Sequence, residues 1–276
     1  MSTSAKPFPI WGFFLLVTNV ILMLAIILLI WRQQKLTTAF ATSTPQQPTN
    51  INPPNQAFVP ELGPRHKLNY QQWLDILKQE AKVAAEKPPE KLTILAGDFL
   101  SLWFPPDLLP EGKNWLNQGI SSETSEGLLK RLDLFDRTKP EVILVMIGIN
   151  DLIRGVGDEE ILANQKQIIR YLRRTHPKAK IILQSILPHG GEEATWEGRE
   201  KLLAIPNSRI RKLNEELEKI ANQQRIKYVN LHPLFTDKQG DLRREFSTDG
   251  LHLNPQGYTV WRTALQIYNE QVTGNR

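Results

Sequence analysis

Two residues near the carboxyl end of the chain, Asp249 and His252, have the types and the spacing of an acid–base pair. A carboxylate three residues before an imidazole can curl within one turn and accept a hydrogen bond from one ring nitrogen. That contact fixes the tautomer of the imidazole and stabilises its protonated form, which leaves the other ring nitrogen as a general base. Many such pairs carry no function, so this pair alone is a weak indication of catalysis.

Two further positions could donate hydrogen bonds to an oxygen that becomes negatively charged during a reaction. Gly119 lies in a turn after one predicted strand, and Asn150 lies in the sequence Gly148-Ile149-Asn150-Asp151 after another. A backbone N–H and a side-chain amide are the donor types that stabilise an oxyanion. Each of them, taken alone, is more typical of an ordinary turn.

The elements that must position these residues alternate between strands and helices from about residue 66 onward. Helices are predicted over 70–86, about 121–135, 159–175, 206–224 and 255–272, and strands over 91–96, 115–118, 141–147, 179–185 and 226–231. This alternation predicts an α/β fold, a three-layer α/β/α sandwich with a five-stranded parallel sheet. Ligands bind at the carboxyl ends of the strands in such folds, so the polar segments that follow the strands should meet at one edge.

Four of these polar segments together resemble the SGNH/GDSL hydrolase family. They are, in chain order, Gly97-Asp98-x-Leu100, Gly119, Gly148-x-Asn150-Asp151 and Asp249-x-x-His252, and the resemblance covers about residues 90–270. It implies a flavodoxin-like sandwich and the hydrolysis of esters or thioesters. It further implies a Ser nucleophile, a His base oriented by an Asp, and an oxyanion hole. In that hole the N–H of the nucleophile, the glycine N–H and the Asn side chain act together.

The position at which the resemblance implies the nucleophilic serine, directly after Asp98, holds Phe99 instead. A phenyl ring has no lone pair and no proton to lose, so no acyl-enzyme can form through it. Ser101 is the nearest replacement, but two residues along a helix rotate a side chain by about 200°, which would turn Ser101 away from His252. Water activated directly by His252 is a third route, because ~10³–10⁴-fold catalysis over water remains after the loss of a triad member. The sequence leaves open a weak esterase and a non-catalytic protein that binds acylated lipid or polysaccharide.

Two neighbouring segments have less specific features. Residues 102–106 are strongly apolar and fit either the wall of an acyl pocket or, more simply, a part of the core that ends at two prolines. The long insertion over 190–201 could act as a lid over the site. We expect His189, at the start of that insertion, to be a surface histidine, and Ser121 or Ser122 to cap the helix that follows them.

Residues 1–36 are predicted to be a membrane anchor. The run from Trp11 to Trp31 is apolar except for Thr18 and Asn19, and such a helix spans roughly 31 Å, the thickness of a bilayer core. We place the transmembrane helix at about residues 10–31. The alternative is a cleaved signal peptide, because residues 39–41 (Ala-Phe-Ala) have the form of a cleavage site. The apolar run is, however, longer than the ~7–15 residues of a signal segment.

Residues 37–65 are predicted to be a proline-rich linker, and residues 66–276 the hydrolase-like domain. The linker holds six prolines between residues 42 and 64 among Gln, Asn and Thr, a composition that forms an extended spacer rather than a core. We expect a single-pass membrane protein with its domain outside the cytoplasm. Its expected partners are the membrane and a small-molecule, glycan or lipid ester.

The charge balance and the absence of cysteine exclude several function classes. The chain has 34 Lys and Arg against 29 Asp and Glu, and three of the basic residues lie in residues 1–60, which hold no acid. The remainder is therefore nearly neutral and shows no basic stripe of the kind that binds nucleic acid. With no Cys, and with no His at metal-ligand spacing, neither a zinc site nor another metal site is expected, and no cofactor is expected either.

Overall fold

The computed structural model describes residues 68–273, with side chains described up to residue 268. The predicted membrane anchor and the whole of the predicted linker lie outside these residues. Within the described residues, no helix combines the length and the apolar character needed to cross a membrane.

A parallel β-sheet lies at the centre of the described domain. Its strand order is β2-β1-β3-β4-β5, and every neighbouring pair is parallel. This confirms the predicted α/β/α architecture with a five-stranded parallel sheet. The strands are β1 (Leu92–Gly97), β2 (Asn114–Gly119), β3 (Val142–Met146), β4 (Lys180–Gln184) and β5 (Lys227–Val229).

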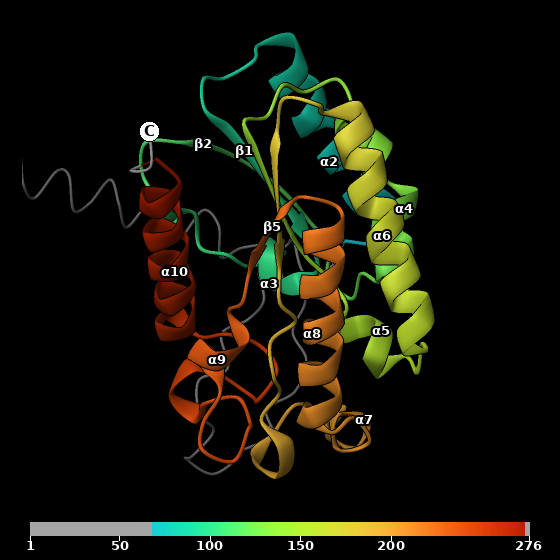
Figure 1. Cartoon of the computed structure of the whole chain (residues 1–276), viewed down its shortest axis with the longest axis vertical. Coiled ribbons are helices and arrows are strands. Elements are labelled where there is room, and N and C mark those ends of the chain that lie inside the picture. The colour runs from blue at the N-terminus through green and yellow to red at the C-terminus, as the bar shows by residue number, and fades with distance from the viewer. Residues whose placement is uncertain (1–67, 274–276) are drawn as a thin grey trace, which may run out of the picture. The chain divides into compact units, whose positions relative to one another are not determined.

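Helices cover both faces of the sheet. Figure 1 shows α10 on one side and α2, α4 and α6 on the other. The long helices are α2 (Tyr70–Glu86), α6 (Asp158–Thr175), α8 (Asn207–Gln223) and α10 (Pro255–Thr273). The short ones are α3 (Phe99–Leu102), α4 (Ser125–Lys130), α5 (Ile149–Ile153), α7 (Arg199–Leu203) and α9 (His232–Phe235), with 3-10 turns η2 (Pro106–Leu108), η3 (Leu132–Phe135), η4 (Gly191–Glu193) and η5 (Arg244–Phe246).

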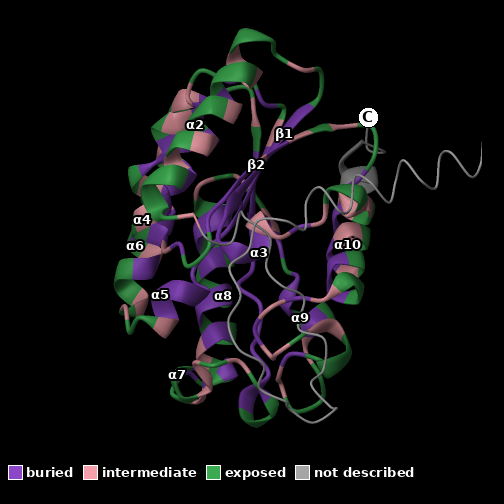
Figure 2. Cartoon of the chain, turned by 180° about the vertical axis from the view of Figure 1, so that it is seen from behind, coloured by how far each residue is buried: buried purple, intermediate pink, exposed green. Residues whose placement is uncertain are grey.

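The central strands are apolar because both of their faces are covered. All six residues of β1 are buried, and β3 and β4 each have one partly or fully exposed residue, at their amino ends. Figure 2 shows the strands as the most continuously buried part of the domain. A strand covered on both faces needs apolar side chains on both, which explains the uninterrupted apolar runs in the sequence.

The helix predicted over 121–135 is divided in the structure, and its predicted cap is wrong. Thr124, rather than Ser121 or Ser122, caps α4, and its hydroxyl accepts a hydrogen bond from the N–H of Gly127 at 3.2 Å. Ser122 has a φ of 60°, in the left-handed region, so the chain is still turning at that residue. After α4 the chain tightens into the 3-10 turn η3.

Candidate active site

The carboxyl ends of three central strands lie side by side. Gly97, the last residue of β1, is in register with Gly119 of β2 and with Met146 of β3. A side chain at position 97 would collide with the carbonyl oxygen of Met146 and the hydroxyl of Ser101. Position 97 therefore requires glycine, which has no Cβ atom. Because the three strands end in register, the polar segments that follow β1, β2 and β3 meet at one edge of the sheet.

Asp98 fixes the direction in which the chain leaves β1. Its Oδ1 accepts a hydrogen bond from the N–H of Leu100 at 3.0 Å, which caps the helix α3 that begins at Phe99. The side chain is only 1% exposed. Burial raises the pKa of Asp98 to about 7; the bond from Leu100 opposes this shift, and the carboxylates of Asp151 and Glu123 add to it.

Asp249 and His252 form the hydrogen-bonded pair that their spacing predicts. Oδ2 of Asp249 lies 2.7 Å from Nδ1 of His252, and Oδ1 accepts from the N–H groups of Leu251 and His252 at 2.9 and 2.8 Å. Burial by itself raises the pKa of Asp249, but the hydrogen bonds from His252 and Leu251 more than offset it and hold the pKa below its ordinary value. Within the described residues, Nε2 of His252 makes no hydrogen bond, so this nitrogen is available to a substrate.

The segment over 190–201, which the sequence suggests as a lid, is bonded to the loop that carries this pair. The N–H groups of Thr195 and Trp196 both donate to the carbonyl of Asp249, at 2.8 and 2.9 Å. The N–H of Gly190 donates to the carbonyl of Gly250 at 2.7 Å. In this structure the segment therefore supports the Asp249–His252 loop.

His189 is not a surface residue, contrary to the sequence-based expectation. Only 2% of it is exposed, and its Nε2 lies 2.6 Å from the carbonyl oxygen of Ile205. Its Nδ1 accepts from the N–H of Gly191 at 3.1 Å, so the ring ties together the two ends of the insertion. Burial lowers the pKa of His189, and the hydrogen bond to Ile205 opposes that shift.

Phe99 stands directly against the imidazole of His252. The two ring centroids are 4.6 Å apart, with an angle of 57° between the ring planes. Phe99 is 3% exposed and belongs to the main hydrophobic core, whereas the side chain of His252 is 36% exposed. The residue after Asp98, at which the sequence resemblance implies a nucleophile, therefore faces the predicted base with an apolar ring.

Ser101 lies on the opposite side of the turn from this contact. It is fully buried, and its hydroxyl makes no hydrogen bond within the described residues. It lies beside Gly97, behind the sheet edge. No described contact joins its hydroxyl to His252, in keeping with the rotation of about 200° between residues 99 and 101 of a helix.

The two predicted oxyanion donors are both engaged in the protein's own hydrogen bonds. The N–H of Gly119 donates to Oδ1 of Asn117 at 2.9 Å, and a side chain at position 119 would collide with the backbone of Leu102. Nδ2 of Asn150 donates to the carbonyl of Glu123 at 3.0 Å. Asn150 keeps a second amide hydrogen, whereas the single N–H of Gly119 would have to leave Asn117 to reach a substrate.

Several contacts that hold the site together are not predicted from the sequence, including those of Asp151, which itself belongs to the third polar segment. Asn117 bridges β2 and α3, because its Nδ2 donates to the carbonyl of Ser101 at 2.6 Å. Asp151 accepts from the N–H and the hydroxyl of Ser125, at 2.8 and 2.5 Å. The only signal in the sequence for these contacts is closeness to a motif: Asn117 precedes Gly119 by two residues, and Asp151 follows Asn150.

A buried ion pair lies beneath the site. Nε of Arg131 is 2.5 Å from Oε2 of Glu123, both side chains are under 5% exposed, and Nη2 of Arg131 donates to the carbonyl of Gly97 at 3.1 Å. The pair thereby links the end of β1 to the turn after β2.

The apolar segment over 102–106 forms a wall of the core at Phe104. The ring of Phe104 packs against that of Trp261, with 4.9 Å between their centroids.

Comparison with family models decides the family of this chain. Residues 94–260, more than half of the chain, match the model of the GDSL-like Lipase/Acylhydrolase family. The chain belongs to this family. Within the described residues, no group of three or more His, Asp or Glu side chains could hold a metal ion.

Curated relatives in this comparison include esterases. The chain is 25% identical over 162 residues to the isoamyl acetate-hydrolyzing esterase of Saccharomyces cerevisiae, covering 54% of this chain and 66% of that protein. It is 30% identical over 146 residues to the platelet-activating factor acetylhydrolase IB subunit alpha2 of Rattus norvegicus, covering 52% and 58%. With an N-acylneuraminate cytidylyltransferase of Streptococcus agalactiae it shares 26% identity over 58% of this chain and 36% of that protein. The chain thus spans between about a third and two thirds of these relatives.

Solved structures of GDSL-family proteins have the same fold. A protein from Streptococcus pneumonia named for platelet activating factor superposes with a TM-score of 0.64 at 26% identity, covering 72% of this chain and 93% of that one. A GDSL-like lipase from Bacteroides thetaiotaomicron superposes with a TM-score of 0.60 at 20% identity, covering 72% and 99%.

Proposed function

We propose that this chain presents an acyl-ester site of the GDSL type that binds esters but hydrolyses them weakly or not at all. The observation that carries the proposal is the contact between Phe99 and His252. The pair of Asp249 and His252 supplies a base with one free ring nitrogen, and the side chain that this nitrogen should deprotonate is a phenyl ring.

The chemistry open to this site follows from what residue 99 lacks. An acyl-enzyme needs a side-chain oxygen that attacks the ester carbonyl while the base removes its proton, and Phe99 has neither. The remaining route is direct attack by water on the carbonyl carbon while Nε2 of His252 takes a proton from the water. The imidazolium then returns this proton to the leaving oxygen as the carbon–oxygen bond breaks, which releases the alcohol and the carboxylic acid. Such a route lacks the covalent step, and we expect it to be slower than serine catalysis by orders of magnitude.

A purely ligand-binding role is the second candidate, and the burial of Phe99 favours it. The ring closes the place of attack and adds apolar surface beside a base that is partly exposed. An acylated lipid or an acylated polysaccharide could bind there and remain intact. Measured turnover separates this candidate from a weak esterase.

Hydrolysis of an activated short-chain ester, such as p-nitrophenyl acetate, by the parent chain and three variants tests the proposal. We expect Phe99→Ser to hydrolyse the ester at least ~10²-fold faster than the parent, because it restores the missing member of the triad. Phe99→Ala is the matched control, since it opens the same space without a nucleophile, and it should stay near the parent rate. A parent that is already active and loses activity in Ser101→Ala would contradict the proposal, as would an inert but folded Phe99→Ser variant.

We further propose that residues 10–31 anchor the chain in a membrane and that the domain lies outside the cytoplasm. The apolar run over 11–31 and the linker after it support this arrangement. Alkaline phosphatase fused to the carboxyl end should be active in cells. Protection of the domain from protease added to intact spheroplasts would contradict the orientation.

A further inference from the structure

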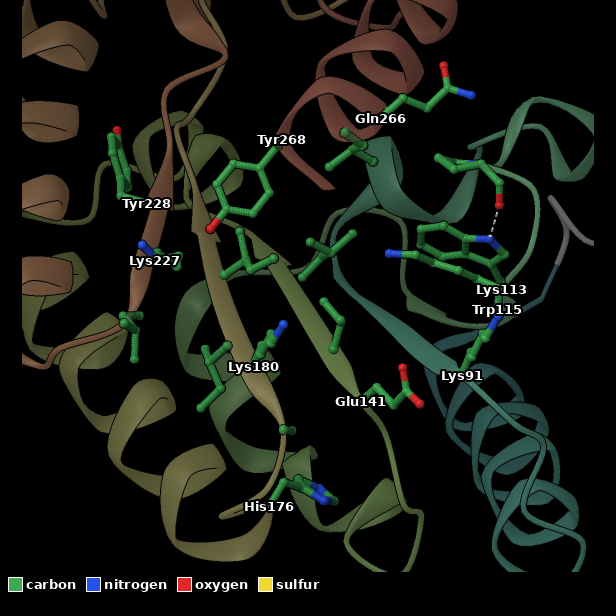
Figure 3. Close-up of a pocket in the computed structure, with 18 of the residues that line it drawn as sticks. Lys91, Lys113, Trp115, Glu141, His176, Lys180, Lys227, Tyr228, Gln266 and Tyr268 are labelled. Atoms are coloured by element: carbon green, nitrogen blue, oxygen red, sulfur yellow. Dashed lines mark hydrogen bonds between the residues drawn. The ribbon is translucent and has the colours of Figure 1, made fainter. Parts of the chain in front are cut away.

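A groove lies at the amino ends of the strands, at the opposite edge of the sheet from Asp249 and His252. Its volume is about 1270 Å³, and it is bounded by the starts of the strands, the segment before β2 and the second half of α10. Figure 3 shows its side chains converging from these elements. None of the residues that build the candidate active site lines it.

The groove combines an apolar floor with a basic rim. The apolar side chains that are partly exposed in the groove are Trp115, Val142 and Ile226, and the buried Leu144, Ile182 and Leu265 also line it. Seven Lys or Arg residues line the groove against three Glu residues. Four of the lysines stand at the starts of four different strands: Lys91, Lys113, Lys180 and Lys227. Within the described residues, Lys91, Lys180 and Lys227 take part in no ion pair.

The positive charges of this rim lie close enough to act on one another. Burial lowers the pKa of Lys113; the carboxylate of Glu141 opposes this shift and the ammonium of Lys180 adds to it. Like charges gathered at the rim of a groove are stabilised by an anion that binds among them. The chain's own acids supply less than half of the charge needed to balance the rim.

Two of the basic residues stand where the backbone favours glycine. Lys91 has a φ of 51° and Arg225 a φ of 53°, both in the left-handed region. Arg225 ends α8 in the position that glycine usually fills, with its N–H bonded to the carbonyl of Asn222. Both residues therefore hold a backbone conformation that is unfavourable for a residue with a Cβ atom.

A buried hydroxyl in the groove also lacks a partner. Oη of Tyr268 is inaccessible to solvent, yet it makes no hydrogen bond within the described residues. Figure 3 shows Tyr268 reaching from α10 into the groove, with its hydroxyl directed toward the strands. A buried hydroxyl without a partner costs free energy, but this one has no surface open to a ligand, so ligand binding in the groove does not depend on it.

We propose that this groove binds an anionic amphiphile with a single alkyl chain, whose carboxylate lies among the lysines and whose chain covers the apolar floor. The positive charge of the rim favours a ligand with an anionic group. The apolar residues of the groove favour a ligand with an alkyl chain over a small inorganic anion, which would leave these residues in contact with water. The site is independent of ester hydrolysis, since it shares no residue with the Asp249–His252 edge.

Photolabelling of the full chain in nanodiscs of uncharged lipid tests this site. The probe is dodecanoate that carries a photoreactive diazirine in its chain, and the labelled peptides are mapped by mass spectrometry. We expect saturable labelling of peptides that contain residues 179–182 or 262–268. Unlabelled dodecanoate should compete, whereas dodecanol, which lacks the charge, and acetate, which lacks the chain, should compete at least ~10-fold less well.

Variants of exposed lysines separate this groove from general charge effects. The double variant Lys180→Glu/Lys227→Glu should lose most of the labelling. Lys212→Glu, an exposed position on α8 outside the groove, should label like the parent. Labelling that maps elsewhere, that survives the double variant, or that dodecanol and dodecanoate suppress equally would overturn the proposal. Circular dichroism confirms that each variant is folded, and Phe99→Ser should leave the labelling unchanged.

Discussion

The two sides of the candidate active site are held in different ways. The side that carries Asp249 and His252 is a partly exposed loop fixed by hydrogen bonds, three of them accepted by the Asp249 carboxylate. The side that carries Phe99 is a short helix packed into the hydrophobic core. Polar chemistry therefore depends on the first side and stability on the second. In the proposed site, the position of the nucleophile falls on the side where an apolar residue adds to the core.

The largest expected effect concerns the hydrogen-bonded side. In the Phe99→Ser background, we expect Asp249→Asn to lower kcat about 10⁴-fold, because an amide holds the imidazole in the wrong tautomer. The unfolding free energy should fall by only about 1 kcal/mol, since Oδ1 of the amide keeps its bonds to the backbone. Ester hydrolysis and urea denaturation measure the two effects. A loss of unfolding free energy as large as the loss of activation free energy calculated from kcat would show that the loop serves folding rather than proton transfer.

The apolar side should respond in the opposite way. We expect Phe99→Ala to lower the unfolding free energy by ~3–5 kcal/mol, because it leaves a cavity in the core, whereas Phe99→Leu should cost less than ~1.5 kcal/mol. Chemical denaturation of the two variants measures the difference. If Phe99→Ala proves neutral, Phe99 is not part of the core and its contact with His252 is loose.

The smallest effect is a pH dependence at the junction of the two sides. The pKa of Asp98 is raised to about 7, so between about pH 4 and pH 7 the folded state holds a proton that the unfolded state has lost. This group therefore makes stability fall as the pH rises through that window. Asp98→Asn, which keeps an acceptor for Leu100, should remove this slope, while Asp75→Asn at an exposed position should not. An unchanged slope in Asp98→Asn would place the pKa of Asp98 near its ordinary value.

The sequence was sufficient to predict the order of strands and helices and the pairing of Asp249 with His252, because both depend on local patterns. The apolar runs followed from burial on both faces, and the pair followed from a spacing of three residues. Asn117, Glu123 and Arg131 were not predicted to support the site, since their partners lie on other elements. His189 was placed on the surface, but the fold of the insertion buries it against Ile205.

The basic groove could not be predicted from the sequence either, for a related reason. Its lysines lie at residues 91, 113, 180 and 227, so no window of the chain contains a basic cluster. The parallel sheet brings the starts of these strands to one edge, and only there does their charge accumulate. A nearly neutral domain can thus carry a strongly uneven charge distribution.

Covalent labelling with a fluorophosphonate tests the central claim most directly, because the reagent reacts with a hydroxyl only when a base is positioned to activate it. We predict no adduct on the parent, one adduct per chain at position 99 in Phe99→Ser, and loss of that adduct in Phe99→Ser/His252→Ala. An adduct on the parent chain, or a folded Phe99→Ser variant that stays unlabelled, would contradict a GDSL site that lacks only its nucleophile.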